Sequence, residues 1–271
     1  MRRAARVVVM SVDFLALHDG PEPLLLGNAW DVGTAKALAF LGFRALATTS
    51  AGHAAALGRD DGGVTRDEAL AHAATLAGAT DLPVSADLED GFADDAAGAA
   101  ETVRLAAQTG LAGCSIEDWS RTRGVILDLG LAVEKVAAAA EAAHAGGLVL
   151  TARAENHIRD VDDLDDTITR LQAYERAGAD VLYAPGLTAA DDIRRVVTAL
   201  RRPVNVLARP GVPPVAELGR LGVRRVSVGG AFALVAYGAL ATAARELLDE
   251  GTYGYWATAR EAAALRGAFG S

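Results

Sequence analysis

The sequence has 271 residues, of which 51% are hydrophobic and 23% charged, a globular composition large enough for one big barrel or two small domains. Its formal net charge of -9 argues against nucleic acid as the main partner, because phosphate backbones select basic surfaces. Its single cysteine, Cys114, excludes an internal disulfide and fits a reducing compartment.

The first twenty residues begin like a signal peptide, with two arginines and the run VVVM. However, Asp13 interrupts the apolar run, and no small-residue cleavage site follows a long apolar region. We therefore interpret this segment as a short helical or extended lead-in. No stretch approaches a membrane-spanning length without a charge, so we expect a cytoplasmic protein with no membrane partner.

Short apolar runs alternate with longer alanine-rich helical patterns along the rest of the chain. The apolar runs, each typical of a strand, lie at 24–28, 44–50, 82–88, 112–118, 148–155, 180–185, 203–208 and 224–230. The helical patterns lie near 31–41, 65–78, 94–109, 131–145, 162–177, 189–200, 214–221 and 231–249. Most of the apolar runs are continuous rather than alternating, which is typical of parallel strands buried on both faces.

The alternation of eight strands with eight helices predicts a closed (β/α)8 TIM barrel. The rival architecture, an open doubly wound sheet, carries a GxGxxG turn after its first strand, whereas this chain has GNAWDVG there. No Pro/Gly/Ser-rich linker divides the sequence. We therefore expect one domain over 1–271, with an additional C-terminal helix at about 252–271.

Acidic residues follow the strands at the end where a barrel of this type has its active site. Asp87 and Glu89 follow the third strand, and Glu117 ends the fourth. Ionised carboxylates gathered in one place are costly unless a cation compensates for them. Oxygen ligands without cysteine or paired histidines favour Mg²⁺, or Mn²⁺, over zinc. The sequence therefore predicts a metal held by Asp87, Glu89 and Glu117.

An acidic residue just after a strand can instead cap the following helix. We interpret Asp90, Asp94 and Asp95 in this way, and the charge run at 162–166 as a solvated helix start. For Glu117 and its neighbour Asp118, taken alone, both interpretations stay open. Further polar candidates at the same end are Asn205 in the seventh strand and His53 after the second, and His53 is equally compatible with a helix-start or surface position.

Four motifs in combination, GNAWDVGTAKALAFLGFRALATTSAG, ADLEDGF, GCSIED and TARAEN, resemble the phosphoenolpyruvate mutase/isocitrate lyase superfamily. The resemblance extends from about Leu24 to Trp256. It implies a (β/α)8 barrel and a homo-oligomer, dimeric or tetrameric, in which a terminal helix is exchanged between subunits. The segment after Gly251 is the candidate for that helix.

The resemblance also implies roles for individual residues. The superfamily's acidic pair and metal-shell glutamate fall on Asp87, Glu89 and Glu117. Its loop acid falls on Asp61, with Asp60 as the less favoured register, and its carboxylate-binding arginine falls on Arg153. Its oxyanion-binding turn falls on Ser50, Ala51 and Gly52.

These roles imply a Mg²⁺-dependent enzyme that makes or breaks a C–C or P–C bond beside a small 2-oxo acid through an enolate-like species, with a 2-oxo acid or related di- or tricarboxylate as its partner. The candidate catalytic residues are Arg153, Asp61 and His53. The candidate substrate-binding residues are Ser50, Ala51, Gly52, Arg153 and Asn205.

The chain departs from the superfamily's lyases after the fourth strand. Those lyases carry a mobile loop with a Lys-x-Cys-Gly-His core, whereas WSRTRGVILDLG follows Asp118 here and holds no Cys, Lys or His. The departure favours decarboxylation, retro-aldol cleavage or hydrolysis of an oxo acid over isocitrate-type cleavage. The alternatives are a non-catalytic regulatory barrel that binds metal and a 2-oxo acid, and an enzyme similar to a class II aldolase.

Overall fold

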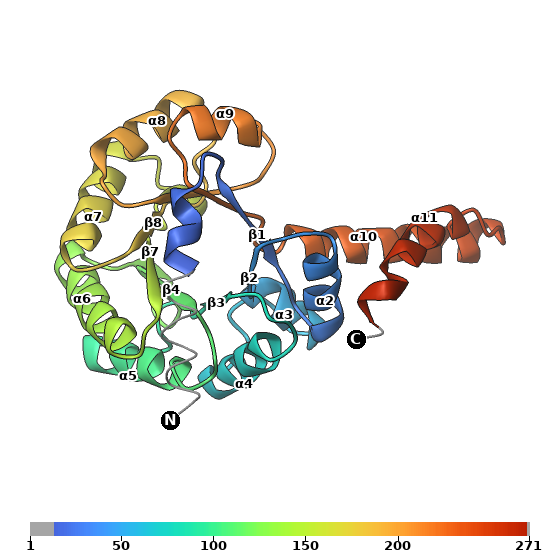
Figure 1. Ribbon diagram of the computed structural model, residues 1–271, viewed down its shortest axis with the longest axis horizontal. Coiled ribbons are helices and arrows are strands. Elements are labelled where there is room, and N and C mark those ends of the chain that lie inside the picture. The colour runs from blue at the N-terminus through green and yellow to red at the C-terminus, as the bar shows by residue number, and fades with distance from the viewer. Residues whose placement is uncertain (1–13, 270–271) are drawn as a thin grey trace.

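Eight parallel strands close into a barrel in this computed structural model, which describes residues 14–269 (Figure 1). The order around the barrel is β1-β10-β9-β8-β7-β4-β3-β2. The strands are β1 (Leu24–Asn28), β2 (Ala45–Ala47), β3 (Val84–Asp87), β4 (Gly113–Glu117), β7 (Val149–Arg153), β8 (Val181–Tyr183), β9 (Val204–Leu207) and β10 (Arg225–Ser227). The predicted barrel is thus confirmed, and the first thirteen residues of the expected lead-in lie outside the described residues.

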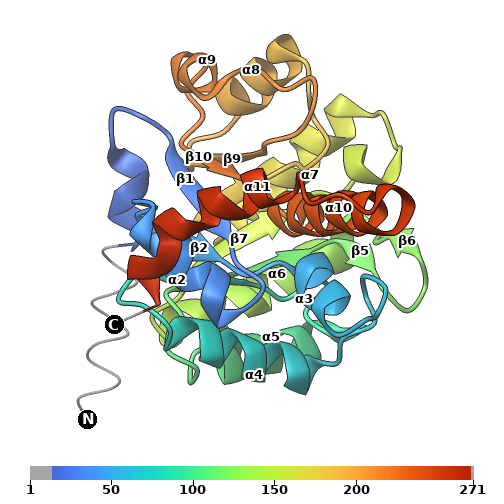
Figure 2. The ribbon, with the colours of Figure 1, turned by 90° about the vertical axis from the view of Figure 1, so that its right-hand side faces the viewer.

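Helices α2 to α9 surround the barrel and connect its strands, and α10 and α11 follow the last strand (Figures 1 and 2). They are α2 (Val32–Phe40), α3 (Ser50–Ala56), α4 (Arg66–Ala77), α5 (Ala96–Ala106), α6 (Leu129–Ala145), α7 (Leu164–Arg176), α8 (Ala190–Ala199), α9 (Val215–Arg220), α10 (Ala231–Arg245) and α11 (Trp256–Glu261). Short polar side chains fix several helix starts, as expected. Asp95 accepts from the backbone N–H of Gly98, and Asp163, in the predicted charge run, accepts from that of Asp166. Asp94, expected to be a cap, instead accepts from the hydroxyl of Thr122.

The barrel interior is apolar at the end away from the C-terminal ends of the strands. Phe14 is fully buried there against Leu24, Leu26 and Val149. Gly113 is required for this packing, because a Cβ at that position would lie 2.9 Å from the Phe14 ring. The larger hydrophobic cluster fills the layer between the strands and the helices. The barrel is therefore closed at its lower end, and access to its interior comes from the strand C-termini.

Two local elements near the site differ from the sequence-based expectation. The residues after β4 form an antiparallel hairpin of β5 (Trp119–Ser120) and β6 (Val125–Ile126) rather than an irregular loop. The predicted oxyanion turn at Ser50 is the first turn of α3, whose N-cap Thr49 accepts from the backbone N–H of Gly52. Both elements are short, so neither shows a periodic apolar pattern.

Helix α10 leaves the barrel wall and projects into solvent (Figures 1 and 2). A π-helical turn, η3 (Glu246–Glu250), continues it, and the chain then returns through α11 to η4 (Ala262–Ala268), which packs against α2. The predicted additional C-terminal helix is present, divided between α11 and η4. By length and composition alone, Ala231–Glu250 is also the one segment within residues 14–269 apolar enough to cross a membrane.

Candidate active site

A cavity of about 230 Å³ opens at the C-terminal ends of the strands and continues down into the barrel. Residues from the ends of β1, β2, β3 and β7 line its mouth, and polar residues of β8, β9 and β10 line its deeper part. Of the predicted site residues, those lining this cavity are Ser50, Ala51, Asp61, Asp87, Arg153 and Asn205. The position is the one that a (β/α)8 barrel uses for catalysis.

Arg153, the last residue of β7, holds three carboxylates together. Its Nη1 lies 3.1 Å from Asp87 Oδ1, and its Nη2 lies 3.0 Å from Glu117 Oε2 and 2.9 Å from Glu155 Oε1. Burial raises the pKa of the Glu117 carboxyl well above its usual range, and it raises the pKa of Glu155 as well. Burial thus opposes the ionisation of Glu117 and Glu155, while the charge of Arg153 stabilises their ionised forms.

Glu89 lies in the loop after β3 and pairs with an arginine of the β5–β6 hairpin. Its Oε2 is 2.5 Å from Arg121 Nε, and its side chain is 8% exposed. Burial raises the pKa of the Glu89 carboxyl to about 7, although Arg121 opposes the shift. The backbone of Glu89 has a φ of 48°, a left-handed conformation that costs a non-glycine residue energy. Such strain is typical of a residue held in place for function.

The start of α3 brings polar groups to the cavity mouth. The Ser50 hydroxyl donates to Asp87 Oδ2 at 3.2 Å, which orients that carboxylate. Gly52 is required here, since a Cβ would lie 2.6 Å from Thr49 Cγ2. Its backbone N–H is bound to the Thr49 hydroxyl, so the expected three-residue oxyanion cradle reduces to the helix N-terminus at Ser50 and Ala51.

His53 and Asp61 lie in different surroundings. Asp61 reaches the cavity from an exposed loop, whereas His53 lies outside it and stacks on His72 with ring centroids 3.7 Å apart. The two histidines border a much smaller cavity behind Asp87 and Glu89. Burial lowers the pKa of His53, and burial together with His53 lowers that of His72 to about 4, so both rings are neutral at pH 7.

Asn205 is buried, and its side chain is hydrogen-bonded within the protein. Its amide donates to Ser227 Oγ at 2.9 Å, and its carbonyl oxygen accepts from Arg225 Nε at 3.0 Å.

The sequence did not identify two further residues of this region. Glu155 belongs to the TARAEN motif but was interpreted only through Arg153. Arg225 lies inside a strand, where the pattern gave no sign that it faces the cavity.

The family model described as phosphoenolpyruvate phosphomutase matches residues 14–248 of this chain. The chain belongs to the phosphoenolpyruvate mutase/isocitrate lyase superfamily. A solved Burkholderia cenocepacia structure, named as a candidate lyase/mutase, is 49% identical, has a TM-score of 0.89, and is matched over 93% of this chain and 92% of its own.

Two curated superfamily relatives are also similar to the chain. An uncharacterised protein of Mycobacterium tuberculosis is 36% identical over 240 residues, which is 88% of this chain and 90% of the relative. An oxaloacetate decarboxylase of Bradyrhizobium is 30% identical over 210 residues, which is 74% of this chain and 71% of the relative. Both matches cover more than two thirds of this chain, in agreement with the resemblance seen in the sequence.

Backbone hydrogen bonds close the hairpin after β4. Gly124 donates its backbone N–H to Ser120, and Leu127 donates to Asp118, so the segment returns to the barrel within a few residues. Asp118 itself points away from the cavity. It accepts from the hydroxyl of Tyr174 at 2.6 Å and pairs with Arg170 at 3.2 Å. Asp118 therefore neither lines the cavity nor caps a helix, and instead it fixes the buried side chains of Tyr174 and Arg170.

Proposed function

We propose that this chain is a Mg²⁺-dependent lyase that breaks a carbon–carbon bond beside a small 2-oxo acid, most simply by decarboxylation. The observation that carries the proposal is the single cavity in which Asp87 and Arg153 meet at 3.1 Å, at the C-terminal ends of their strands. Superfamily membership supports enzymatic activity, and an oxaloacetate decarboxylase is among the relatives.

The donor set fits a hard cation that keeps most of its water. Within residues 14–269, no three His, Cys, Asp or Glu side chains gather closely enough to enclose a metal ion. Mg²⁺ needs no such enclosure, because it commonly binds through one or two carboxylates and retains several waters. Asp87 is the predicted ligand that lines the cavity, so we assign it direct contact. Glu89 and Glu117 would then act through water.

The chain's own residues provide binding and orientation. Arg153 lines the cavity and pairs with Asp87 through one Nη1 hydrogen, so the other Nη1 hydrogen would donate to a substrate carboxylate. Ser50 and the N-terminus of α3 hold the opposite side of the cavity mouth and fix the Asp87 carboxylate. Bound there, Mg²⁺ would stabilise the negative charge that develops on the 2-oxygen.

The residues of the β5–β6 hairpin support one class of reaction within this proposal. The β5–β6 hairpin holds no Cys, Lys or His. Cys114 cannot substitute for a loop cysteine, because it is fully buried and burial raises the pKa of its thiol to about 12. We therefore favour decarboxylation or a related cleavage over the cysteine-dependent cleavage of isocitrate-type substrates.

A panel of 2-oxo and 2-hydroxy diacids tests the proposal. We expect Mg²⁺-dependent release of pyruvate, glyoxylate or carbon dioxide from at least one diacid, and a loss of about 100- to 1000-fold in Asp87→Asn. Asp67→Asn, a highly exposed position, is the matched control. Tight Mg²⁺-dependent binding of oxalate without turnover of any diacid would favour the regulatory barrel, and no oxalate binding at all would contradict the site.

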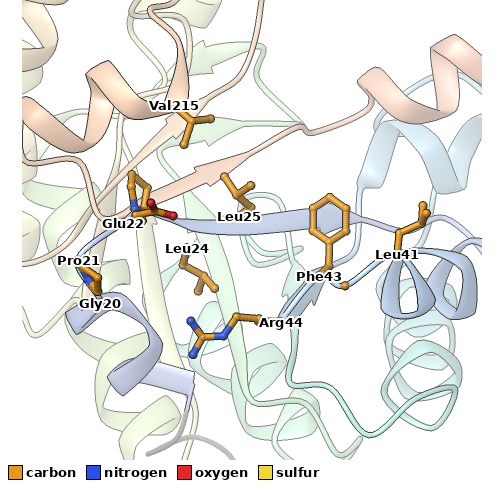
Figure 3. Close-up of a pocket in the computed structure, with 11 residues that line it drawn as sticks. Gly20, Pro21, Glu22, Leu24, Leu25, Leu41, Phe43, Arg44 and Val215 are labelled. Carbon is orange, nitrogen blue, oxygen red and sulfur yellow. The ribbon is translucent and has the colours of Figure 1, made fainter.

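The segment after Gly251, expected from the resemblance to be the exchanged helix, packs through η4 against α2 of the same chain. We therefore propose a homo-oligomer formed through α10. Leu234, Val235 and Leu240 on this helix are 63–70% exposed. The barrel wall has an apolar groove of about 390 Å³, in which Leu25 of β1 lies beside Phe43 (Figure 3). Leu25 is 42% exposed although it belongs to a barrel strand. A strand of a closed barrel is normally covered by helices. The α10 of a second copy would cover this groove.

A cytoplasmic location remains a prediction of the sequence.

A further inference from the structure

A second arginine, Arg225, lies inside the barrel below the Asp87–Arg153 pair. It is the first residue of β10, is 4% exposed, and lines the deep part of the same cavity. Its Nε donates to Asn205 Oδ1 and its Nη2 donates to Thr151 Oγ1, both at 3.0 Å. Its Nη1 is buried and finds no hydrogen-bond partner among the residues that the structure describes.

The charge of Arg225 is not balanced by its described neighbours. Its hydrogen-bond partners, Asn205 and Thr151, are both neutral. Burial lowers the pKa of its guanidinium to about 10, and the group that opposes this shift is the Tyr183 phenol, so Arg225 stays protonated at neutral pH. His18 lies near the closed end of the barrel. Burial, together with the positive charge of Arg225, lowers the pKa of this histidine to about 4. Arginine is rarely buried to this extent without an anionic partner.

The surroundings of Arg225 suit an anionic ligand. The walls of this part of the cavity carry hydroxyl groups, which can rotate to donate hydrogen bonds to an anion. They come from Ser85, Ser115 and Tyr183, whereas the Ser227 hydroxyl is already bonded to Asn205 and Tyr183. The guanidinium itself has both hydrogens of Nη1 and one of Nη2 uncommitted, the arrangement that binds a carboxylate through two parallel hydrogen bonds.

The depth of Arg225 sets the length of the ligand. Arg225 binds Thr151, which lies two residues before Arg153 on β7, and two residues of a strand span roughly 7 Å. A four-carbon chain places its terminal carboxylate oxygens on the order of 6 Å apart, judged from standard bond lengths. The rise from Thr151 to Arg153 is thus of the same order as the length of a four-carbon diacid and exceeds that of a two-carbon diacid.

We propose that Arg225 forms an anion subsite that binds the distal carboxylate of a four-carbon 2-oxo or 2-hydroxy diacid. The proximal end of the diacid would lie at Asp87 and Arg153, and for this placement the inference rests on the proposed function. In this subsite the ligand carboxylate would pair with the buried Arg225 guanidinium, which has no anionic partner among the described residues. It selects diacids over monoacids, because a monoacid leaves the Arg225 charge uncompensated.

Malate and lactate provide a matched pair of probes. They share the 2-hydroxy acid end, and they differ in the distal carboxylate of malate, which lactate lacks. By calorimetry with Mg²⁺ present, and with both enantiomers of each acid, we expect the wild-type protein to bind malate about 10- to 100-fold more tightly than lactate. In Arg225→Gln this ratio should fall to near one. Arg224→Gln, the adjacent but exposed arginine, should retain the wild-type ratio.

Asn205→Asp provides an independent test if Arg225→Gln does not fold. The change is nearly isosteric and places a carboxylate against Arg225 Nε, so that the guanidinium acquires a partner inside the protein. We expect the malate-to-lactate ratio to fall in this variant too. A wild-type ratio in whichever of the two variants folds would overturn the subsite.

Oxalate distinguishes failure of this inference from failure of the proposed function. Oxalate is too short to reach Arg225 from Arg153, so wild type and Arg225→Gln should bind it with equal affinity when Mg²⁺ is present. If the wild type does not bind oxalate, the proposed function fails. If both proteins bind oxalate and both keep the same malate-to-lactate ratio, only the Arg225 subsite fails.

Discussion

Arg121 of the β5–β6 hairpin forms an ion pair with Glu89 of the loop after β3, with Nε 2.5 Å from Oε2. The same guanidinium donates to the backbone carbonyls of Gly62 and Val64, in the loop that carries Asp61. One side chain therefore connects three loops at the cavity mouth. The hairpin after β4 thus holds Glu89 and the loop of Asp61 in position.

Arg121→Met should destabilise the metal-free protein in a pH-dependent manner. The folded-state pKa of Glu89, about 7, is above its usual 4.5, so ionised Glu89 destabilises the fold increasingly as pH rises above about 4.5. Removing Arg121 raises that pKa further. We expect a loss of about 1–3 kcal/mol in the free energy of unfolding at pH 8, and a smaller loss at pH 5, where Glu89 is protonated in both proteins.

Urea denaturation in EDTA at the two pH values measures this effect. Arg123→Met, an exposed arginine on the same hairpin, is the control and should change the free energy of unfolding little at either pH. An equal loss for Arg121→Met at pH 5 and pH 8 would mean that the ion pair with Glu89 is not its cause.

Tyr174→Phe should lower stability without affecting turnover. The Tyr174 hydroxyl donates to Asp118 Oδ2 at 2.6 Å, and the Asp118 carboxyl is buried on the far side of β4 from the cavity. Removing the donor should cost about 1–2 kcal/mol, measured by urea denaturation. Tyr253→Phe, at an exposed position, is the control. A fall in kcat larger than the fall in the folded fraction would instead connect Asp118 to the reaction.

The positions of the residues at the cavity mouth could be predicted from the sequence, because a single property of the fold determines them. The last residues of parallel strands meet at one end of the barrel, so the positions of Asp87 and Arg153 follow from recognising β3 and β7. The pairing of Glu117 and Glu155 with the same arginine could not be predicted in that way. It depends on side-chain directions at the strand ends, which the spacing of residues does not determine.

The floor of the cavity was missed for a related reason. Arg225 lies in the run RRVSVGG, where two arginines precede the apolar residues, and the pattern does not say which of them enters the barrel. In the structure Arg224 is exposed and donates to the carbonyl of Gly20, whereas Arg225 is buried. The direction of each side chain is set by the register of β10 against β1 and β9, which is a tertiary property.

Removing Mg²⁺ should destabilise the protein by mass action. A ligand that binds only the folded state stabilises it by about 2.7 kcal/mol at a concentration 100 times its Kd. We therefore expect the melting temperature to rise with added Mg²⁺ and to return to its starting value with EDTA. Asp87→Asn should show no rise, whereas Asp67→Asn should match wild type. A Mg²⁺-dependent rise that survives in Asp87→Asn would place the ion elsewhere.

Charging the exposed face of α10 should dissociate the proposed oligomer. Leu234→Glu with Leu240→Glu places two carboxylates where we expect apolar contact with a second copy, and desolvating such charges is unfavourable. Sedimentation velocity should show the wild type as a dimer or tetramer and the variant as a monomer. Leu25→Glu, in the groove of Figure 3, should have the same effect from the other side of the interface. A wild-type monomer would contradict the proposal.

Cys114 should take no part in the reaction. It is fully buried in β4, and burial raises the pKa of its thiol to about 12, so it carries no thiolate at neutral pH. Native protein should therefore not react with a thiol reagent such as 5,5'-dithiobis(2-nitrobenzoic acid), whereas the denatured protein should release one equivalent per chain. Cys114→Ala should retain kcat/KM within about twofold once the folded fraction is taken into account, since only a small buried side chain is shortened. A loss of kcat in a fully folded Cys114→Ala protein would show that this thiol moves a proton, and the decarboxylase-like chemistry favoured for this site would then have to be replaced by a cysteine-dependent cleavage.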